Sequence, residues 1–378
     1  MTMAVLPAVF PAGLLGLVAI AWWLTLDRVR HFPDLPERIS DTESPLVCLC
    51  MPVRNEALEV GSALDSWLGQ TAVELQLVVV DDGSTDGSTE LLRARQEAHP
   101  DRLTVVRNDR LPVGWLGKNH ALHLAVQQPQ ACDAEWLLFV DADVHAHPKL
   151  LARAFAHLGT RGGDFLALWP AMVARTFWER VTIPLAGLVI LMGVPPRRVQ
   201  DPGSPFAFGA GAFILVRRSA YEAIGGHAAA PLMAIDDVGM ALRLKRAGYL
   251  NALAVGAPWL WLRPAHGFLE LVASLRKNVL GLPGMLALAP FLAVGTVLFF
   301  SAPLWLACLG RPWSGLMLWL LVPPLIALSQ RRFSKILPDW RWLLWPLAAI
   351  PSVTAILLAT EDKLKGVNRW RGRDVSLR

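Results

Sequence analysis

Cysteine is scarce in this chain of 378 residues, which contains four. None of the four stands in a Cys-x-x-Cys pair or at a metal-site spacing, which argues against a zinc module and a disulfide framework. Cys48 and Cys50 point to the same face of a predicted strand and cannot easily form a bridge. We therefore expect four reduced cysteines that act as small hydrophobic side chains in a cytosol-facing protein. They are Cys48, Cys50, Cys132 and Cys308.

Charged residues are also few, at 18% of the chain, and no dense Lys/Arg stripe with interleaved aromatic residues occurs. The usual basic footprint of a nucleic-acid-binding protein is therefore absent, and we expect no nucleic-acid partner. Hydrophobic residues reach 54%, which is high for a soluble globular domain. The net charge of +5 is modest and suits a protein that lies against anionic lipid. The composition predicts a membrane-embedded protein.

The first apolar segment, from about Met3 to Leu26, is long enough to cross a hydrocarbon core of roughly 30 Å. A cleaved signal peptide should begin with positive charge and end in small residues, whereas this segment begins uncharged and ends in Trp22-Trp23 and then Arg. We therefore predict an uncleaved transmembrane anchor over residues 1–27. The positive-inside rule predicts a cytoplasmic domain next, because basic residues follow the anchor. These residues are Arg28, Arg30 and Arg38.

Three further apolar stretches follow the middle of the chain, at about Met285 to Leu309, Trp313 to Ser329 and Trp342 to Thr360. Tryptophans near their ends are typical of membrane interfaces, so residues 285–360 are predicted to be transmembrane segments. Three full crossings would place the basic tail, residues 361–378, on the side opposite the cytoplasmic domain, against the charge rule. Either one stretch is re-entrant or interfacial, or the rule fails; the sequence leaves both open.

Between these segments, residues 45–280 alternate between short apolar runs and amphipathic stretches. This alternation predicts an α/β domain with a mostly parallel sheet, right-handed crossovers and helices on both faces. The predicted strands are Leu46 to Met51, Leu75 to Val80, Leu103 to Arg107 and Trp136 to Val140, and the predicted helices are Ala57 to Leu68, Thr89 to Ala98 and Asn119 to Val126.

Three acidic clusters occur in this domain: Asp81-Asp82, Asp141-Ala142-Asp143 and Asp236-Asp237. The first two follow apolar runs at predicted strand ends. In open α/β sheets, ligands bind beyond the carboxyl ends of the strands. We therefore expect the acidic clusters to share one crevice that carries the chemistry.

Motifs in a fixed order along the middle domain resemble those of the family 2 glycosyltransferases of the GT-A fold. They are Pro52-Val53-Arg54-Asn55-Glu56, Val80-Asp81-Asp82-Gly83-Ser84-Thr85-Asp86-Gly87, Gly114-Trp115-Leu116-Gly117-Lys118-Asn119, Asp141-Ala142-Asp143, and Asp236-Asp237 followed by residues 243–249. The flanking apolar segments and the terminal Trp370-Arg371-Gly372-Arg373 are similar to the membrane-bound branch that includes hopanoid-associated and carotenoid glycosyltransferases and, more distantly, ceramide glucosyltransferases. The resemblance implies a Rossmann-like GT-A domain and a nucleotide-sugar donor.

The nucleotide base needs a planar slot edged by donors and acceptors, which a strand tip with Asn55 and Glu56 opposite Asp82 can supply. The resemblance implies that Asp82 accepts a hydrogen bond from the base imide and that the Pro52 backbone lines the slot. An alternative is that Asp81 to Ser84 form only a turn and an N-cap for the helix predicted from Thr89.

Asp141 and Asp143 form a DxD tripeptide whose carboxylates can share a hard divalent ion, Mg²⁺ or Mn²⁺, that bridges the two phosphates of the donor. A solvated strand end is the alternative. Lys118 stands at a predicted helix start, where backbone donors and a cation favour phosphate or ribose oxygens; a surface lysine is the alternative.

Asp237 is the predicted general base, because a carboxylate opposite the diphosphate can accept the proton of the attacking hydroxyl. One in-line displacement would invert the anomeric configuration. By resemblance, Asp237 matches the second residue of the family's Glu-Asp pair, and Asp236 replaces the Glu. Alternatively, both acids cap a helix over Val238 to Ala247.

Two other segments bear on the acceptor. Residues 206–213 contain glycines that suit a loop wrapping the donor or acceptor sugar, and Phe177 to Val194 reads as an interfacial helix or a buried one. The Gln-x-x-Arg-Trp motif of processive family members is absent, and the corresponding region instead offers Arg276 and Lys277 as diphosphate partners.

These patterns predict a metal-dependent inverting glycosyltransferase that moves a hexose from a nucleotide sugar, UDP-linked by expectation, to a membrane lipid hydroxyl. It would be a multi-pass protein of the cell membrane with a cytoplasmic catalytic domain. A processive polysaccharide synthase and a non-catalytic membrane scaffold that retains the fold are the alternatives.

Overall fold

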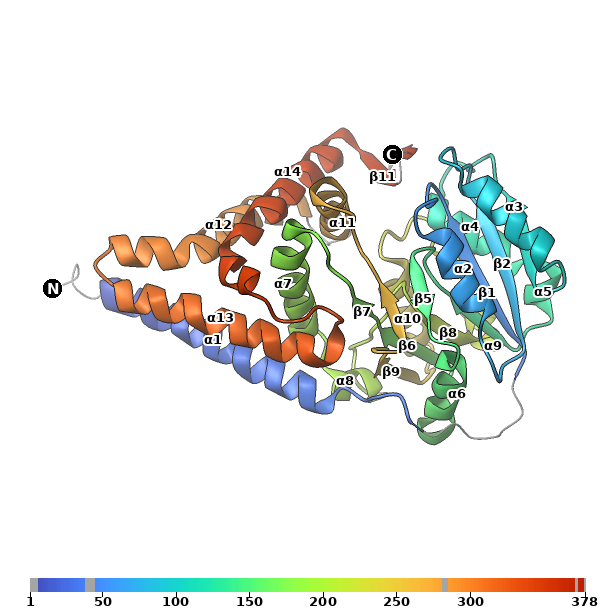
Figure 1. The fold of residues 1–378 in the computed structure, drawn as a ribbon, viewed down its shortest axis with the longest axis horizontal. Coiled ribbons are helices and arrows are strands. Elements are labelled where there is room, and N and C mark those ends of the chain that lie inside the picture. Colours follow the sequence, from blue (N-terminus) through green and yellow to red (C-terminus); the bar gives the residue numbers. More distant parts are fainter. Residues whose placement is uncertain (1–5, 38–44, 281–284, 371–372, 377–378) are drawn as a thin grey trace.

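A computed structural model of the chain describes residues 6–37, 45–280, 285–370 and 373–376. An α/β domain occupies one end of the molecule, and a group of long helices extends from it toward the N-terminus (Figure 1). The mostly parallel α/β fold expected from the sequence is confirmed.

The main sheet has seven strands in the order β3-β2-β1-β4-β8-β6-β9. Strand β8 runs antiparallel to its neighbours β4 and β6, and the other pairings are parallel. The strands are β1 (Val47–Val53), β2 (Leu75–Asp81), β3 (Leu103–Arg107), β4 (Trp136–Phe139), β6 (Phe165–Trp169), β8 (Ile214–Arg217) and β9 (Asn251–Val255).

Both faces of this sheet are covered by helices, as the continuous apolar runs of its strands require. One core cluster joins the sheet to α2 (Val60–Leu68), α3 (Ser88–Ala98) and α6 (Leu150–Arg161). A second cluster on the other face joins it to α4 (Gly117–Val126), α5 (Pro129–Cys132), α8 (Pro196–Gln200), α9 (Arg218–Ala223) and α10 (Asp236–Arg246). The 3-10 helix η1 (His227–Ala229) leads toward α10.

A smaller sheet lies between the α/β domain and the long helices. It consists of β5 (Val144–Ala146), β10 (Leu260–Leu262) and β7 (Ala171–Met172), with β10 in the centre. Strand β5 follows the second acidic cluster directly. The small sheet therefore continues from the predicted crevice toward the helical part.

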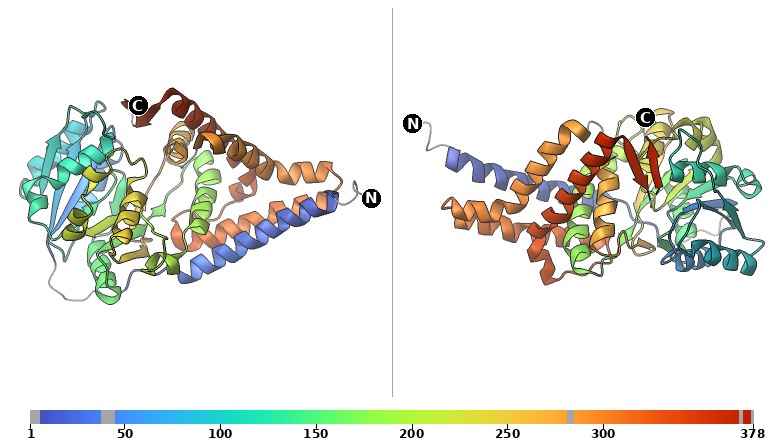
Figure 2. Two further views of the ribbon diagram at one scale, coloured as in Figure 1. Left: turned by 180° about the vertical axis from the view of Figure 1, so that it is seen from behind. Right: turned by 90° about the horizontal axis from the view of Figure 1, so that it is seen from above.

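The helical part contains α1 (Leu6–His31), α7 (Phe177–Gly193), α11 (Phe268–Leu280), α12 (Met285–Cys308), α13 (Pro312–Phe333), the 3-10 helix η2 (Trp340–Ala348) and α14 (Ala349–Lys365). A hairpin of β11 (Val367–Trp370) and β12 (Arg373–Ser376) follows (Figure 2). Within the described residues, three helical stretches are long and apolar enough to cross a membrane: Ala287–Cys308, Pro312–Phe333 and Trp340–Lys365. The anchor predicted over residues 1–27 remains a prediction, because residues 1–5 lie outside the described part.

The chain after α1 returns to the sheet. The Val255 amide donates a hydrogen bond to the Pro33 carbonyl over 2.8 Å, and Asp34 forms a parallel bridge with Val255. The Arg332 side chain at the end of α13 bonds the Phe32 carbonyl and pairs with Asp34. The ends of α1 and α13 are thus joined beside β9, the last strand of the sheet.

Two differences between the predicted and observed elements have a local structural cause. The helix predicted from Ala57 begins at Val60, because Asn55 adopts a φ of 53° and the following residues form a turn. The last apolar stretch, predicted as one segment, is divided into η2 and α14, with Leu344 at a non-helical kink.

Candidate active site

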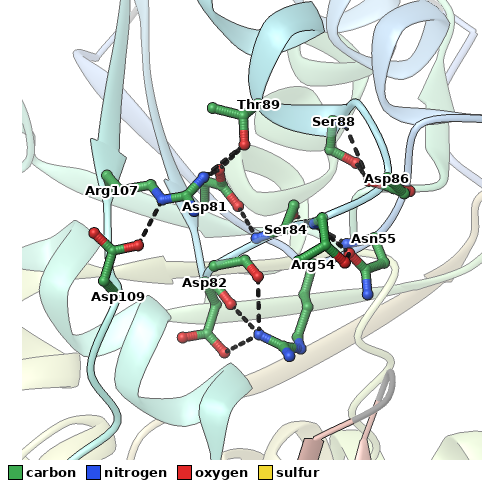
Figure 3. A network of polar contacts seen from close by, with 12 residues as sticks. Arg54, Asn55, Asp81, Asp82, Ser84, Asp86, Ser88, Thr89, Arg107 and Asp109 are labelled. Atoms are coloured by element: carbon green, nitrogen blue, oxygen red, sulfur yellow. Dashed lines mark hydrogen bonds and ion pairs between the residues drawn. The ribbon is translucent and has the colours of Figure 1, made fainter.

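Strand β2 ends in Asp81, whose carboxylate organises the loop that follows (Figure 3). It accepts hydrogen bonds from the Ser84 amide at 2.9 Å and the Thr89 hydroxyl at 2.6 Å, and it pairs with Arg107 of β3 at 2.7 Å. Burial alone would raise the pKa of Asp81, but these bonds and the Arg107 charge outweigh it and lower the pKa. Asp81 is therefore an ionised structural group that fixes the loop.

Asp82 directly follows β2, and it has no exposed surface. Its Oδ1 accepts a hydrogen bond from Asn108 Nδ2 at 2.6 Å, and Arg54 approaches its Oδ2 at 4.0 Å and also bonds its carbonyl. Arg54 follows β1, so a guanidinium covers the carboxylate predicted to meet the base (Figure 3). Asn108 and Arg54 were not predicted as site residues.

Asn55 and Glu56 tie the loop after β1 to the loop after β2. The Asn55 amide donates to Ser84 Oγ at 3.1 Å, and its Oδ1 accepts from the Thr85 amide at 2.8 Å. The Glu56 amide donates to Ser88 Oγ at 2.9 Å. Pro52 lies in β1 opposite Val80 of β2. The structure thus joins the loop that carries Asn55 and Glu56 to the loop that follows Asp82, and base binding by these residues remains a prediction.

Lys118 links the second and third acidic clusters. From the start of α4, its Nζ lies 2.9 Å from Asp141 Oδ1, after β4, and 3.2 Å from Asp236 Oδ2, at the start of α10. Burial would lower the pKa of Lys118, but the carboxylates of Asp141 and Asp236 outweigh it and raise the pKa. The crevice therefore holds a permanent cation between acidic residues from distant parts of the chain.

The loop after α8 closes this cluster by backbone contacts. The Gly211 amide donates to Asp237 Oδ2 at 2.7 Å, and the Asp141 amide donates to the Gly211 carbonyl at 3.1 Å. A Cβ at Gly209 would lie 2.2 Å from the Asp237 carbonyl oxygen, and one at Gly211 would lie 2.8 Å from Asp141 Oδ2. A side chain at Gly209 would clash with the Asp237 backbone, so glycine is required there, whereas one at Gly211 would displace the Asp141 carboxylate. The approach of this loop to a sugar remains a prediction.

Asp236 and Asp237 are adjacent but have opposite electrostatic environments. Burial raises the pKa of Asp237, and the neighbouring Asp236 carboxylate raises it further. Burial would also raise the pKa of Asp236, but the positive charges of Lys118 and Lys277 outweigh this effect and lower the pKa. Two carboxyl groups whose pKa values are driven apart are typical of a site that moves a proton. Neither acid is an N-cap, because both lie in the first turn of α10 and the cap residue is Ile235.

Asn119 holds the segment that leads to these acids. Its Nδ2 lies 3.3 Å from the Ala230 carbonyl oxygen, 3.1 Å from that of Pro231 and 3.0 Å from that of Met233. Its position directly after Lys118 is the sequence signal that could have identified this role. The Lys118-Asn119 pair therefore positions both the charge and the loop.

The residues present fit a divalent ion. Among the residues that the structure describes, no group of three or more His, Cys, Asp or Glu side chains could hold a metal alone. Mg²⁺ and Mn²⁺ at phosphate sites are commonly held by one or two carboxylates, with phosphate and water supplying the rest. Asp141, with 37% of its side chain exposed, and Asp143, two residues further, provide such a pair.

The two predicted diphosphate partners on α11 have different surroundings. Lys277 is exposed and close enough to Asp236 to lower its pKa, so it faces the crevice. Arg276 instead contacts Asp362 of α14, with its Nε 2.5 Å from Oδ2. A contact of Arg276 with a diphosphate remains a prediction.

The family description "Glycosyl transferase family 2" matches residues 48–225. A curated relative, 4,4'-diaponeurosporenoate glycosyltransferase of Staphylococcus aureus, is 28% identical over 186 residues, which are 48% of this chain and 46% of the relative. The chain therefore matches about half the length of this relative.

A solved structure shares the fold. The mannosyltransferase PcManGT from Pyrobaculum calidifontis, described in complex with GDP-Man and Mn²⁺, superposes with a TM-score of 0.58 at 19% identity. The alignment covers 94% of this chain and 98% of that one. The similarity thus extends beyond the α/β domain to most of the helical part.

Proposed function

Because residues 48–225 match the description of glycosyl transferase family 2, we propose that this protein transfers a sugar from a nucleotide sugar to a lipid hydroxyl in the membrane. The observation that carries the proposal is the cluster of Lys118, Asp141, Asp236 and Asp237. We place the slot for the base at Asp82, whose partner Asn108 contacts His120 of α4, the helix that carries Lys118. A nucleotide in that slot would direct its diphosphate toward Lys118.

The donor is proposed to be UDP-linked. Asp82 would accept the hydrogen bond that the N–H of a uracil imide donates, with Asn108 and Arg54 fixing its carboxylate. The similar mannosyltransferase was described with GDP-Man, and guanine also presents a ring N–H next to a carbonyl. Binding of both nucleotides must therefore be compared.

Asp141 and Asp143 would hold Mg²⁺ or Mn²⁺. The bound ion would supply charge stabilisation for the departing diphosphate. The similar mannosyltransferase was described with Mn²⁺. Lys118 and Lys277 would add positive charge at the phosphates from the opposite walls of the crevice, one from α4 and the other from α11.

Asp237 would act as the general base. Its buried carboxyl has a raised pKa, so it is a stronger proton acceptor than an ordinary aspartate once ionised. The Gly211 amide fixes Oδ2. Direct displacement by the activated hydroxyl would invert the configuration at the anomeric carbon.

The acceptor would come from the bilayer. Apolar helices flank the α/β domain, and α11 carries Lys277 to the crevice. A relative is named for glycosylating 4,4'-diaponeurosporenoate, and that name supports a lipid-like acceptor here. Arg28 and Arg30, at the end of α1 next to the α/β domain, support a cytoplasmic position for that domain.

Nucleotide binding with and without metal tests the proposal. Purified full-length protein should bind UDP at least about tenfold more tightly with Mn²⁺ present, because the ion links the diphosphate to two carboxylates. The Asp143→Ala variant should lose this gain and its transferase activity. The exposed Asp133→Ala on the same domain serves as the matched control and should behave as wild type.

Two outcomes would contradict parts of the proposal. Equal affinity of the wild type for UDP with and without metal would exclude the metal role of Asp141 and Asp143. Failure to bind any nucleotide in either condition would favour a non-catalytic scaffold, and tighter binding of GDP than UDP would exclude the uracil assignment.

A further inference from the structure

The last apolar stretch begins and ends beside the α/β domain. At its start, Ser334 forms a parallel bridge with Met172 of β7, and the Lys335 amide donates to the Met172 carbonyl at 3.1 Å. At its end, Asp362 of α14 pairs with Arg276 of α11. Helix α11 is itself fixed near the domain, because His266, just before it, contacts Glu59 at 2.7 Å.

Between these ends, the segment reaches far along the helices α12 and α13. Trp345 of η2 donates a hydrogen bond from Nε1 to the Trp319 carbonyl at 3.2 Å, and Trp319 Nε1 donates to the Leu343 carbonyl at 2.5 Å. The Trp345 ring lies 5.6 Å from the rings of both Phe299 and Phe300. Residue 319 is about 10 Å from the start of α13 and about 20 Å from its end at Phe333, at 1.5 Å per residue.

The segment therefore leaves the α/β domain, turns between the long helices and returns to the domain. Residues 334–339 run away from the domain, η2 turns near the middle of α12 and α13, and α14 returns to the domain, where β11 and β12 follow it (Figures 1 and 2). We propose that helices α12 and α13 cross the bilayer as a hairpin, whereas Ser334 to Lys365 is re-entrant. The β11–β12 hairpin then lies on the same side as the α/β domain. The proposal rests on the membrane part of the proposed function and is independent of the glycosyl transfer.

The distribution of basic residues agrees with this topology. In this arrangement one basic residue, Arg311, lies at the turn between α12 and α13. The helix ends on the domain side carry Arg28, Arg30, Arg331, Arg332, Lys363 and Lys365. An excess of Lys and Arg marks the cytoplasmic side, so both the domain and the end of α14 fit that side. Full crossing by the last stretch would place Lys363 and Lys365 opposite the other basic ends.

The acidic residue at the start of the turn of the re-entrant segment has its charge compensated within the protein. Asp339 accepts a hydrogen bond from the Arg341 amide at 2.7 Å and pairs with Arg180 of α7 at 2.7 Å and with the Arg341 side chain at 2.9 Å. Non-helical backbone at membrane depth is tolerated where it is buried in protein. Pairing of Asp339 with two arginines meets the same condition for its charge.

The native cysteines provide reporters. Cys308 is exposed at the tip of the α12–α13 hairpin, Cys132 is exposed on the α/β domain, and Cys48 and Cys50 are buried. Three full-length proteins should be made: Cys132→Ser, Cys308→Ser, and the double variant with one cysteine appended after Arg378. Each is labelled with a membrane-impermeant maleimide in right-side-out and inside-out vesicles, and then in detergent as a positive control.

We expect Cys308 to be labelled from one side only, and Cys132 and the appended cysteine from the other side only. Labelling of the appended cysteine from the Cys308 side would show that the last stretch crosses and would overturn the proposal. Labelling of Cys308 from the Cys132 side, or in detergent alone, would overturn the crossing of α12 and α13. Nucleotide binding by the same variants reports separately on the proposed function.

Discussion

At the scale of single residues, the crevice gives two neighbouring aspartates different protonation behaviour. Asp236 shares Lys118 with Asp141, so its charge is compensated and its pKa is lowered, whereas at Asp237 burial and the Asp236 charge prevail and raise the pKa. The same side-chain type can therefore serve as a fixed anion and as a proton acceptor, one position apart. This difference leads to a prediction about rate and pH.

Replacing Asp237 with Asn should lower the transfer rate by roughly 10² to 10⁴ fold while nucleotide binding persists, because the amide cannot accept the proton. In the wild type, the base must be ionised to act. Since the pKa of Asp237 is raised, kcat/KM should fall with decreasing pH at values above the ordinary aspartate range of about 4. Steady-state kinetics across pH checks both statements.

Asp236→Asn is the matched comparison. It should shift the pH dependence of kcat/KM, but it should affect the rate of proton transfer less. Removing its negative charge removes a cause of the raised pKa of Asp237, so the acid limb should move to lower pH. A rate near wild type for Asp237→Asn would assign the base to another group.

The sequence predicted the charged residues of the site but not the residues that hydrogen-bond to them and position them. Asp82, Lys118, Asp141 and Asp237 stand in motifs that contain their own signal. Asn108 and Arg54 act on Asp82 from the loops after β3 and β1, and such long-range pairs leave no local pattern in the sequence. Only the register of the sheet brings them together.

At the scale of elements, helix α7 has two distinct faces. Leu188 is 2% exposed in the core shared with α13 and η2, whereas Val189 and Ile190 are 58% and 45% exposed. Periodicity predicted the helix but could not orient it, because its sequence is apolar nearly all round. The buried alternative describes the face of α7 that carries Leu188, and the interfacial alternative describes the face that carries Val189 and Ile190.

The faces of α7 can be separated by matched substitutions. Ile190→Glu should reduce membrane association and transfer to a lipid acceptor while leaving UDP binding intact, because a charge on an exposed apolar face opposes lipid contact. Leu188→Glu should destabilise the fold by several kcal/mol through an unpaired buried charge. Flotation with vesicles, transfer assays and thermal unfolding distinguish these results. Full transfer by Ile190→Glu would exclude lipid contact at this face.

The ion pair between α11 and α14 offers a second test at this scale. Arg276→Gln should lower the free energy of unfolding by about 3 kcal/mol, because Asp362 is only 2% exposed and loses its compensating charge. The double variant Arg276→Gln with Asp362→Asn should recover much of this loss. The exposed pair of Lys365 and Glu361 on α14 is the control, and Lys365→Gln should cost less than about 1 kcal/mol. Equal losses for both pairs would contradict the structural role.

At the scale of the whole molecule, the fold predicted from alternating runs is confirmed, but the path of the last apolar stretch was left open. Hydropathy measures whether a segment suits lipid, and it does not record on which side the segment ends. The Ser334 bridge and the Asp362 pair supply that information, and both depend on partners far away in the chain.

Two buried histidines predict how the stability of the whole fold depends on pH. Burial lowers the pKa of His157 and of His227 to about 4. The unfolded chain binds these protons near the ordinary value of about 6.5, so stability should be full above that pH and decline as pH falls toward 4. Each histidine contributes on the order of 3 kcal/mol to this dependence.

Thermal unfolding of the full-length protein in detergent between about pH 7 and pH 4 measures this dependence. His157→Gln should flatten the curve relative to wild type, whereas the exposed His99→Gln should not change it. A curve for His157→Gln parallel to wild type would show that other groups dominate.

The contact of Pro33 and Asp34 with Val255 makes the first segment part of the sheet margin. Strand β9 is one of the two edge strands of the main sheet, and an uncovered edge presents unpaired amides and carbonyls to other molecules. A chain shortened by its first 37 residues, which is a natural choice for obtaining a soluble enzyme, would lose more than an anchor. It would expose a template for self-association, so insolubility of such a fragment should not be taken as a sign that the catalytic domain depends on lipid.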